Sequence, residues 1–541
     1  MKKAIFASAL LAATIISVTQ SSQAQSAVDA LQVTQRDFKG TARFMSMGGA
    51  FTALGGDLSA INLNPAGIGV YRSSEIAATL DIDIQGTKGT SDTYYEKNSQ
   101  TKAYCNNFGY VGTALLDHTL QTFSWGVTYN RLASFDRLVS GYAQPVGTSL
   151  TNYIAAFTGN TPAEDLAFGT NYNPYIDSNC DWLSILAYNS YLINNVNGSD
   201  TQYRGLFQAG TDGDSCLMVH EKGYVDNYEF TFGGNFADIV FWGLGIGIND
   251  LRYLRYTNYS EIMTNAAVYA ENSPSGITPG KAEYYLDNNK IITGTGWNLS
   301  FGLIAKPIQE LRIGASIISP TWYNLSESYF ATVDYAITPT NTRFESLDGY
   351  EYTEDADFNW RLRSPWRFNI GAAGVISNKA IISFDYELQA YPDMTMKNAT
   401  YDKWGYITGY APNNFINENI RQYTQNASNI RLGVEYRITP SFSARLGYNL
   451  QTSNINSEYQ NAKAEIITSG TDPSFSLDKT TNYISAGLGY RFGGFYADAT
   501  YVHKTATSTL HPYTSYADVD APRFDVTDNN NSIVLSVGFK F

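Results

Sequence analysis

The last ten residues of the chain, Ser532 to Phe541, alternate between two kinds of side chain. The odd-numbered positions are apolar (Ile533, Leu535, Val537, Phe539 and Phe541), and the even-numbered ones are mostly small or polar. Successive side chains of a β-strand point to opposite faces, so this segment has one apolar face and ends in an aromatic residue. Such a strand is typical of the one that closes a bacterial outer-membrane β-barrel. It therefore predicts the solvent, the compartment and the architecture of the whole chain.

The first 24 residues have the features of a secretory signal peptide. Lys2 and Lys3 precede an apolar stretch from 4 to 18, and Ser22-Gln23-Ala24 is a small-x-small cleavage site. A transmembrane anchor is the alternative, but the stretch is short and polar residues follow at once. We expect the mature chain to start at Gln25 and to reside in the outer membrane of a Gram-negative bacterium.

Composition excludes several other classes of protein. Beyond the leader no apolar run is long enough to span a membrane as a helix, and 45 Gly and 41 Tyr suit a barrel with aromatic belts. The net charge of -14 argues against a nucleic-acid partner. Cys180 and Cys216 fall in one long predicted loop and could pair, or all three cysteines could be free thiols. No Cys/His pattern suggests a metal, and we expect no cofactor.

About fourteen strands with alternating faces recur along the chain, an even number as single-chain bacterial barrels require. They are expected at 75–86, 104–116, 121–132, 226–236, 239–249, 295–306, 311–320, 366–377, 379–390, 428–438, 442–452, 481–492, 495–503 and 532–541. Short and long connections alternate between them without a break. A soluble β-sandwich has no reason to sort its loops in this way. The sequence thus predicts an all-β fold, a transmembrane antiparallel β-barrel with short periplasmic turns and long external loops.

The strand faces predict which polar residues point into the barrel. Charges facing lipid would cost a few kcal/mol each, so the charged face of each strand is assigned to the lumen. The resulting lumenal candidates are Asp385, Arg431, Glu435, Arg445, Arg491 and Asp498. The arginines are expected to form a salt-bridge ladder with the carboxylates. A role for one arginine in binding a carboxylate of the cargo is the alternative.

Residues 25–74 do not form strand pairs and are rich in small residues. Asp57 offers a helix N-cap, and Asn64-Pro65 ends the turn that follows it. A lumen of this size is too wide for the wall side chains to fill, so it needs a plug or it is an open pore. We therefore expect a hatch at 25–74 that folds into the lumen of a barrel formed by residues 75–541.

At these positions the chain resembles the FadL/TodX family of outer-membrane channels for hydrophobic molecules. The hatch match is a Gly-rich stretch, Asp57, and then Asn64-Pro65-Ala66-Gly67 just before the first strand. Matching strand segments are Ser364 to Phe368, Ile382 to Tyr386, Arg431 to Arg437, Ser443 to Tyr448 and Tyr483 to Phe492. The resemblance implies a fourteen-stranded barrel plugged by the hatch. It also implies a ligand pocket above the hatch and a sideways exit at a kinked third strand, with Gly126 as the candidate kink.

The long segment 133–225 departs from that family. Its apolar clusters at 183–188 and 191–193 could form short helices with a groove for a first ligand contact. The alternative is packing over the barrel mouth. Cargo selection belongs to such loops, so the substrate of the family is not transferred here.

Three functions remain open. The first is passive uptake of hydrophobic small molecules, such as long-chain fatty acids, by hatch rearrangement and lateral exit. The second is a haem receptor, for which His220, His503 and His511 are available in or near external loops. The third, a lipid-modifying enzyme, is disfavoured, and no catalytic residue is assigned. As partners we expect a hydrophobic ligand, outer-membrane lipid and lipopolysaccharide, and the barrel-assembly machinery acting on the strand that ends at Phe541, with the protein a monomer.

Overall fold

The structure is a computed structural model that describes residues 25–91, 94–116, 119–144, 146–196, 198–377, 379–460, 466–516 and 519–541. The predicted signal peptide and His118, which falls between the predicted strands 104–116 and 121–132, lie outside the described residues. Among the described residues, none of the helices is long and apolar enough to cross a membrane.

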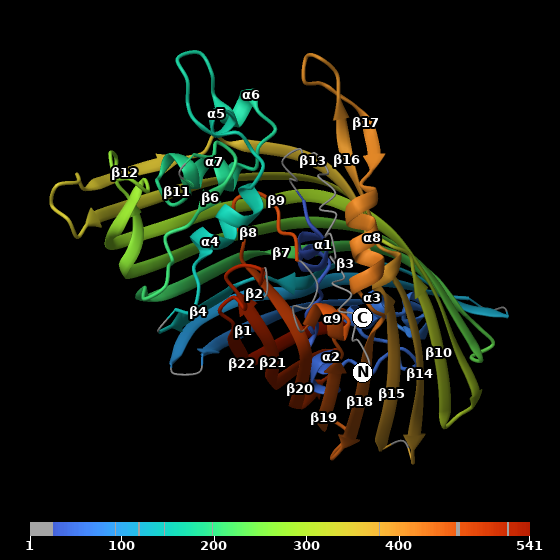
Figure 1. The fold of residues 1–541 in the computed structure, drawn as a ribbon. Helices are drawn as coiled ribbons and strands as arrows, with labels where there is room; N and C mark the ends of the chain where they lie inside the picture. The colour runs from blue at the N-terminus through green and yellow to red at the C-terminus, as the bar shows by residue number, and fades with distance from the viewer. Residues whose placement is uncertain are drawn as a thin grey trace, which may run out of the picture.

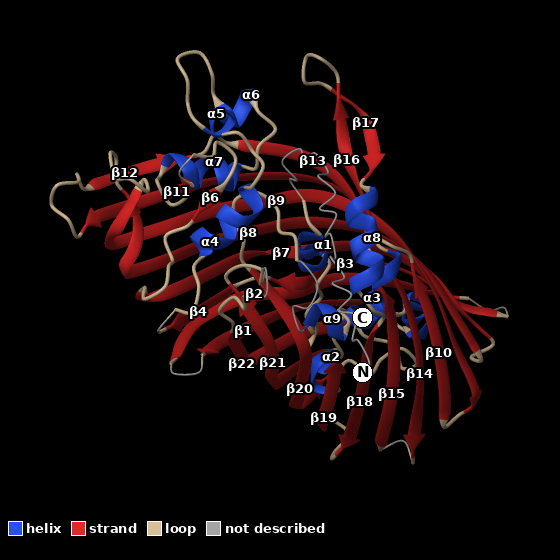
Figure 2. Cartoon of the chain, in the orientation of Figure 1, coloured by secondary structure: helices blue, strands red, loops and turns tan. Residues whose placement is uncertain are grey.

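The chain folds into a closed antiparallel barrel with a wall of 14 strands (Figures 1 and 2). β22 pairs with β1, with Phe539 opposite Ile76, and this pairing closes the wall. The first six wall strands are β1 (Glu75–Thr90), β2 (Tyr95–Leu115), β3 (Leu120–Ser134), β7 (Asp212–Phe236), β8 (Val240–Tyr269) and β9 (Ile277–Ile308). The last five are β18 (Ala427–Arg437), β19 (Phe442–Gln451), β20 (Phe475–Phe492), β21 (Phe495–His511) and β22 (Phe524–Lys540). The predicted fold is confirmed.

Three neighbouring wall strands are each interrupted and counted in two parts. β10 (Leu311–Ile318) continues as β11 (Trp322–Pro339), β13 (Ala356–Arg363) as β14 (Trp366–Ile376), and β15 (Ala380–Ala390) as β16 (Thr395–Tyr401). The breaks contain Pro320, Pro365 and, in the short 3₁₀ turn η2 (Tyr391–Asp393), Pro392. Proline has no N–H to give to a ladder, which accounts for an interruption at each site. The Ser364 hydroxyl accepts a hydrogen bond from the Thr321 N–H at 2.8 Å, so side chains satisfy part of the broken ladder.

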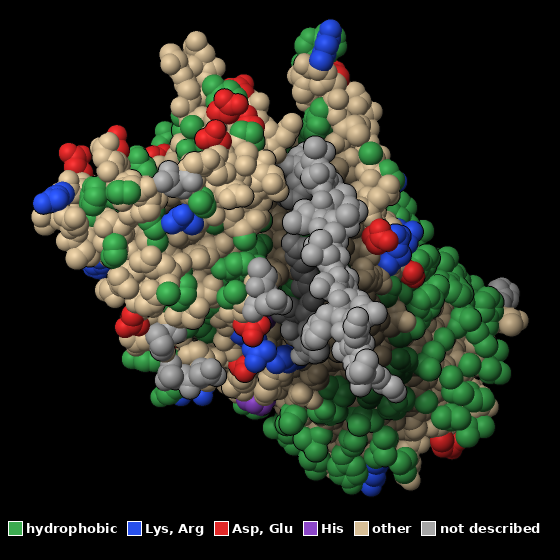
Figure 3. Space-filling model, in the orientation of Figure 1, with side chains coloured by type: hydrophobic (Ala, Val, Ile, Leu, Met, Phe, Trp, Pro, Cys, Tyr) green, Lys and Arg blue, Asp and Glu red, His purple; other side chains and the backbone are tan. Residues whose placement is uncertain are grey.

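The wall faces lipid near the end of the barrel with short turns, here called the inner end. On β9, Trp297, Leu299, Phe301 and Leu303 are 41–48% exposed, whereas the intervening Asn298 and Ser300 are buried. Hydrophobic side chains accordingly gather over the lower part of the molecule in Figure 3, around β10, β14, β15, β18 and β19. At this end a three-residue turn, 237–239, joins β7 to β8. Ala237 and Asp238 both take left-handed backbone angles, with φ of 51° and 62°, as a tight hairpin of this twist requires.

The strands extend further at the opposite, outer end than the sequence predicted. The expected loop 250–294 is largely strand, because β8 runs to Tyr269 and β9 starts at Ile277. Beyond the lipid the outer face of the wall meets water, so the pattern reverses and apolar residues such as Tyr253, Tyr259 and Leu286 are buried inside. Smaller strands extend this region: β4 (Arg137–Ala143), β5 (Asn194–Asn195), β6 (Tyr203–Arg204), β12 (Leu347–Tyr352) and β17 (Ile407–Pro412).

Helices occur inside the barrel and over its outer end (Figure 2). Inside lie α1 (Ala27–Val33), α2 (Ala42–Ser46), α3 (Leu58–Leu63) and the 3₁₀ helix η1 (Pro65–Val70). The outer helices are α4 (Leu150–Thr158), α5 (Ala163–Leu166), α6 (Pro174–Asp177), α7 (Trp182–Asn189), α8 (Asn414–Tyr423) and α9 (Ser457–Gln460). Leu183, Ile185 and Leu186 of α7 are buried in the clusters under these helices. The apolar segment at 183–188 therefore packs over the mouth.

Candidate functional site: the hatch and the lumen above it

Two short helices of the hatch, α2 and α3, have N-cap side chains that bond to each other. The Thr41 hydroxyl caps α2 by accepting from the Phe44 N–H at 3.1 Å. It also donates to the Asp57 carboxylate at 2.8 and 2.9 Å, while Asp57 caps α3 by accepting from the Ser59 N–H. Burial raises the pKa of the Asp57 carboxyl, and the nearby Arg43 offsets part of this effect. Asp57 thus holds the two helices of the hatch together, in keeping with its predicted place as an N-cap.

Asn64, Pro65, Ala66 and Gly67 form the start of η1 and lie against the wall. The Asn64 side chain accepts from the Ala66 N–H at 3.1 Å and donates to the Thr52 carbonyl at 2.6 Å, so it joins two parts of the hatch. Asn64 and Pro65 pack on the glycines of β8 and β9, because a Cβ added at Gly243 or Gly302 would collide with them. The start of η1, at Asn64 and Pro65, therefore contacts β8 and β9.

Gly126 of β3 is regularly paired on both sides, opposite Val111 and Thr231. The pairing register therefore shows no bulge at this residue. The register shifts of β3 lie between Leu120 and Thr122 and between Arg131 and Ala133, and Gly126 instead gives room to Ile68 of η1.

Polar contacts tie the hatch to the wall on many sides. In two of them a hatch N–H donates to a wall side chain, Thr52 to Asp385 (2.7 Å) and Ala42 to Ser536 (2.7 Å). In two others a hatch carbonyl accepts from a wall side chain, Leu63 from Ser316 (2.7 Å) and Leu54 from Arg312 (2.9 Å). Ion pairs add Lys39–Asp81 at 2.6 Å and Arg43–Glu435 at 3.1 Å. Burial alone would lower the pKa of Lys39, but Asp81 and Asp83 outweigh it and raise the pKa. Polar contacts that water could replace therefore hold part of the hatch to the wall, and apolar clusters shared by hatch and wall hold the rest.

The predicted ladder of lumenal charges is present in part. Arg445 pairs with Glu435 and with Asp498, both at 2.6 Å, and Arg43 of the hatch joins the same cluster. Arg431 pairs with Glu387, a carboxylate that the sequence did not single out. Asp385 holds the hatch through Thr52 and makes no ion pair among the described residues. The Arg491 side chain is exposed near the inner end.

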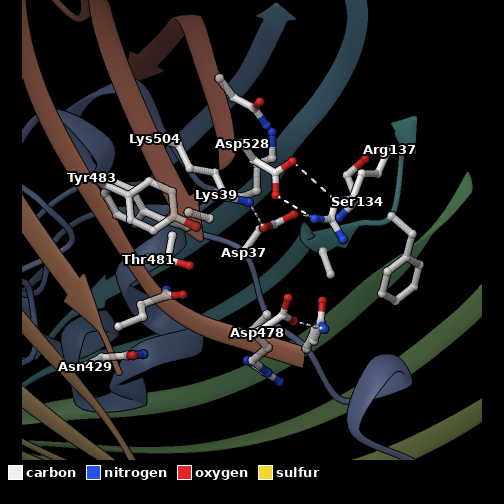
Figure 4. A pocket seen from close by; sticks show the side chains of 18 of the residues that line it. Asp37, Lys39, Ser134, Arg137, Asn429, Asp478, Thr481, Tyr483, Lys504 and Asp528 are labelled. Atoms are coloured by element: carbon white, nitrogen blue, oxygen red, sulfur yellow. Dashed lines mark hydrogen bonds and ion pairs between the residues drawn. The ribbon is translucent and has the colours of Figure 1, made fainter. Parts of the chain in front are cut away.

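A cavity of ≈ 190 Å³ lies above the hatch, and its lining is strongly charged (Figure 4). Asp37 lies 3.1 Å from Lys504, and Arg137 lies 3.0 Å from Asp528. Gln35 donates to Asp478 at 2.7 Å. The resemblance implies a ligand pocket above the hatch, and the cavity found there is lined by charged side chains. The hatch residues that line it lie within 32–39. This segment has no periodic pattern in the sequence, so its place in the cavity could not be predicted.

The apolar part of the lumen is filled by α1. Ala27, Ala30, Leu31 and Val33 pack into a cluster with wall residues such as Tyr253, Leu325 and Trp360 and with side chains of α8 and α9. Asp29 anchors the helix through Lys290 at 2.9 Å and Ser469 at 2.7 Å. Although burial would raise the pKa of Asp29, Lys290 outweighs it and the pKa is lowered. The lumen thus has a charged cavity next to an apolar cluster into which α1 packs.

The remaining candidates from the sequence lie apart from the hatch. Cys180 and Cys216 are not bonded to each other, so the disulfide is absent and the three-thiol alternative holds. The His511 ring is buried and stacks on Phe475 at 4.8 Å, whereas His503 bonds to Asn531. Among the described residues there is no cluster of histidine, cysteine and carboxylate that could hold a metal ion.

The fold defines a class, that of outer-membrane-type β-barrels with an N-terminal helical segment. No protein-family model matches the chain, and no curated protein matches it either. Among solved structures it is similar to a Pseudomonas aeruginosa FadL homologue, with 12% identity over 94% of this chain and 99% of that one and a TM-score of 0.50. The P. putida toluene transporter TodX shares 14% identity over 93% and 99% of the two chains, with a TM-score of 0.46. The Ralstonia pickettii toluene transporter TbuX also shares 14% identity over 93% and 99%, with a TM-score of 0.44.

The chain therefore has a FadL/TodX-like fold. The likeness to the FadL homologue covers nearly the whole of both chains, hatch and wall together.

Proposed function

We propose that the protein is an outer-membrane channel for the passive uptake of hydrophobic small molecules, long-chain fatty acids or similar compounds. One observation carries this proposal. A short N-terminal segment lies inside the lumen, held to the wall by apolar contacts and by hydrogen bonds and ion pairs such as Lys39–Asp81 and Thr52–Asp385. The polar contacts can open without unfolding the barrel, because water can replace them once the hatch moves.

The apolar part of the lumen suits a cargo with an apolar body. The apolar cluster around α1 consists of aromatic and aliphatic side chains, which is the surface that an apolar ligand needs. In this proposal the ligand displaces α1, passes the rearranged hatch and leaves sideways into lipid.

The site of lateral exit is proposed at the proline breaks of the wall. The breaks at Pro320 and Pro365 lie in adjacent wall strands, and a small cavity of ≈ 20 Å³ behind them is lined by Ser319, Thr321 and Ser364. Trp322 and Trp297, whose rings are 4.5 Å apart, mark the edge of the lipid-facing belt beside this point. A ligand that passed here would enter lipid near its outer surface.

The first experiment is uptake of a labelled long-chain fatty acid by cells with and without the gene, with haem uptake measured beside it. Loss of fatty-acid uptake alone is the expected result. Loss of haem uptake alone would refute the proposal and favour the receptor function. For the exit, Ser364→Trp should block uptake in an inserted barrel, and Ser441→Trp, in an exposed turn at the inner end, should not. Equal uptake by both variants would place the exit elsewhere.

A further inference from the structure

A third cavity, of ≈ 70 Å³, lies where the hatch meets the wall. The hatch contributes Phe44, Asn62 and Leu63, and the wall contributes Arg367 and Arg431. Arg36, in the segment between α1 and α2, lines this cavity as well as the charged cavity above and the small one behind the proline breaks. Arg36 thus lies where the three spaces adjoin.

Positive charge is in excess around this third cavity. Arg367 and Arg431 share one carboxylate, Glu387, with Arg367 Nε 2.7 Å from Glu387 Oε1. The Arg36 guanidinium makes no ion pair or hydrogen bond with any residue that the structure describes. The other charged groups that line the cavity are already paired: Asp37 with Lys504, Lys39 with Asp81, and Arg131 with Asp226. In a chain of net charge -14, three guanidinium groups around one carboxylate are an unusual excess of positive charge.

The guanidinium groups also have hydrogen-bond donors without a partner. Nη1 of Arg367 and Nη1 of Arg431 are buried and meet no acceptor among the described residues. The two side chains are 11% and 7% exposed. A buried charged donor without an acceptor is costly, and a planar guanidinium matches the two oxygens of a carboxylate.

We propose that this cavity binds the anionic head group of the cargo, a carboxylate or a similar oxyanion, between Arg36, Arg367 and Arg431. The apolar body of the ligand then lies along Phe44, Leu63 and Leu132, which line the same space. This inference rests on the proposed function and narrows its cargo to amphipathic anions. Burial, and next the neighbouring Arg367, lower the pKa of Arg36 to about 10, so the side chain keeps its charge at neutral pH.

The test is calorimetric titration of the full-length protein in detergent with benzoate, benzyl alcohol and acetate. Arg36→Gln removes the cation that has no wall partner, and Arg343→Gln, in an exposed loop, is the matched control. Benzoate should bind about tenfold or more weakly to Arg36→Gln and unchanged to Arg343→Gln, because a charge-assisted hydrogen bond is lost. Benzyl alcohol, which lacks the charge, should bind alike to all three proteins. Unchanged benzoate binding by Arg36→Gln would overturn the proposal.

A second variant is expected to change the affinity for benzoate in the opposite direction. Glu387→Gln removes the carboxylate that competes for the arginines, so benzoate should bind more tightly, and weaker binding would contradict the site. Barrel integrity is checked for each variant by its migration on gels before and after heating. Acetate that bound as tightly as benzoate would reject the assignment to a cargo head group. The two proposals can fail separately. If benzoate binding required Arg36 but cells without the gene took up fatty acid normally, the proposed function would be refuted and the anion site would remain supported.

Discussion

Replacing Lys39 by methionine should open the hatch. Lys39 Nζ lies 2.6 Å from Asp81 and 3.8 Å from Asp83, and the side chains of Lys39 and Asp81 are 6% and 0% exposed. Removing one partner of a buried ion pair leaves an uncompensated charge and costs about 3–5 kcal/mol. In Lys39→Met this cost falls on the closed state only, because Asp81 regains water when the hatch leaves. The population of the open state should therefore rise about a hundredfold to a few thousandfold.

The open state can be measured as the fraction of time that single channels conduct in a planar bilayer. Lys281→Met is the matched control, since Lys281 pairs with Glu283 at 3.3 Å on the surface, with the two side chains 56% and 30% exposed. An exposed pair of this kind contributes about 0–1 kcal/mol, and its loss should leave conductance unchanged. Equal open fractions for the two variants, with both barrels intact, would refute the claim that ion pairs hold the hatch closed.

Three further outcomes are expected. Deletion of about residues 40–67 should give a folded, leaky pore, and insertion of this variant with unchanged resistance to bulky antibiotics would argue against a plug. Cys180 and Cys216 should both react with a maleimide after denaturation without reductant, and protection of the pair would contradict the free thiols. Asp29→Asn should speed hydrogen exchange in α1, since Lys290 loses its partner. Because the pKa of Asp29 is lowered in the fold, its contribution holds above an ordinary carboxyl pKa of about 4 and is lost only as pH falls through the lowered value.

The wall could be predicted because lipid imposes a strict alternation on each strand. Leu432 and Val434 of β18 are 45% and 42% exposed, and Arg431 and Glu435 on either side of them are buried, as the sequence indicated. The outer extensions of β8 and β9 were missed because water, unlike lipid, does not require an apolar outer face. The proline breaks were visible as Ser319-Pro320 and Ser364-Pro365, but only the sheet pairing shows that they lie in adjacent strands.

The site was harder to predict because its residues come together only in the closed barrel. Asp57 and Asn64 were found from local capping chemistry, which acts over a few residues. The pairing of Arg431 with Glu387 depends on the register between β15 and β18, where Arg431 stands opposite Asp385, two residues from Glu387. Arg36 lies in a segment without periodic pattern, and its importance rests on its lack of an ion-pair or hydrogen-bond partner among the described residues, a property that no sequence pattern records.

The wall glycines that face the hatch allow a last prediction. A Cβ added at Gly447 of β19 would come 2.5 Å from the carbonyl carbon of Met47 and would also collide with Gly48, because the main chain of the hatch lies directly on this strand. Overpacking of this kind costs about 1–3 kcal/mol, and the hatch can relieve it by lifting from the wall. Gly447→Ala should therefore raise the open fraction about fivefold to 150-fold. Gly374→Ala in β14 is the matched control, since its Cβ would meet nothing within 4 Å. Equal open fractions for the two variants would contradict this reasoning. The glycine at 447 would then be explained by the curvature of the wall and not by close contact with the hatch.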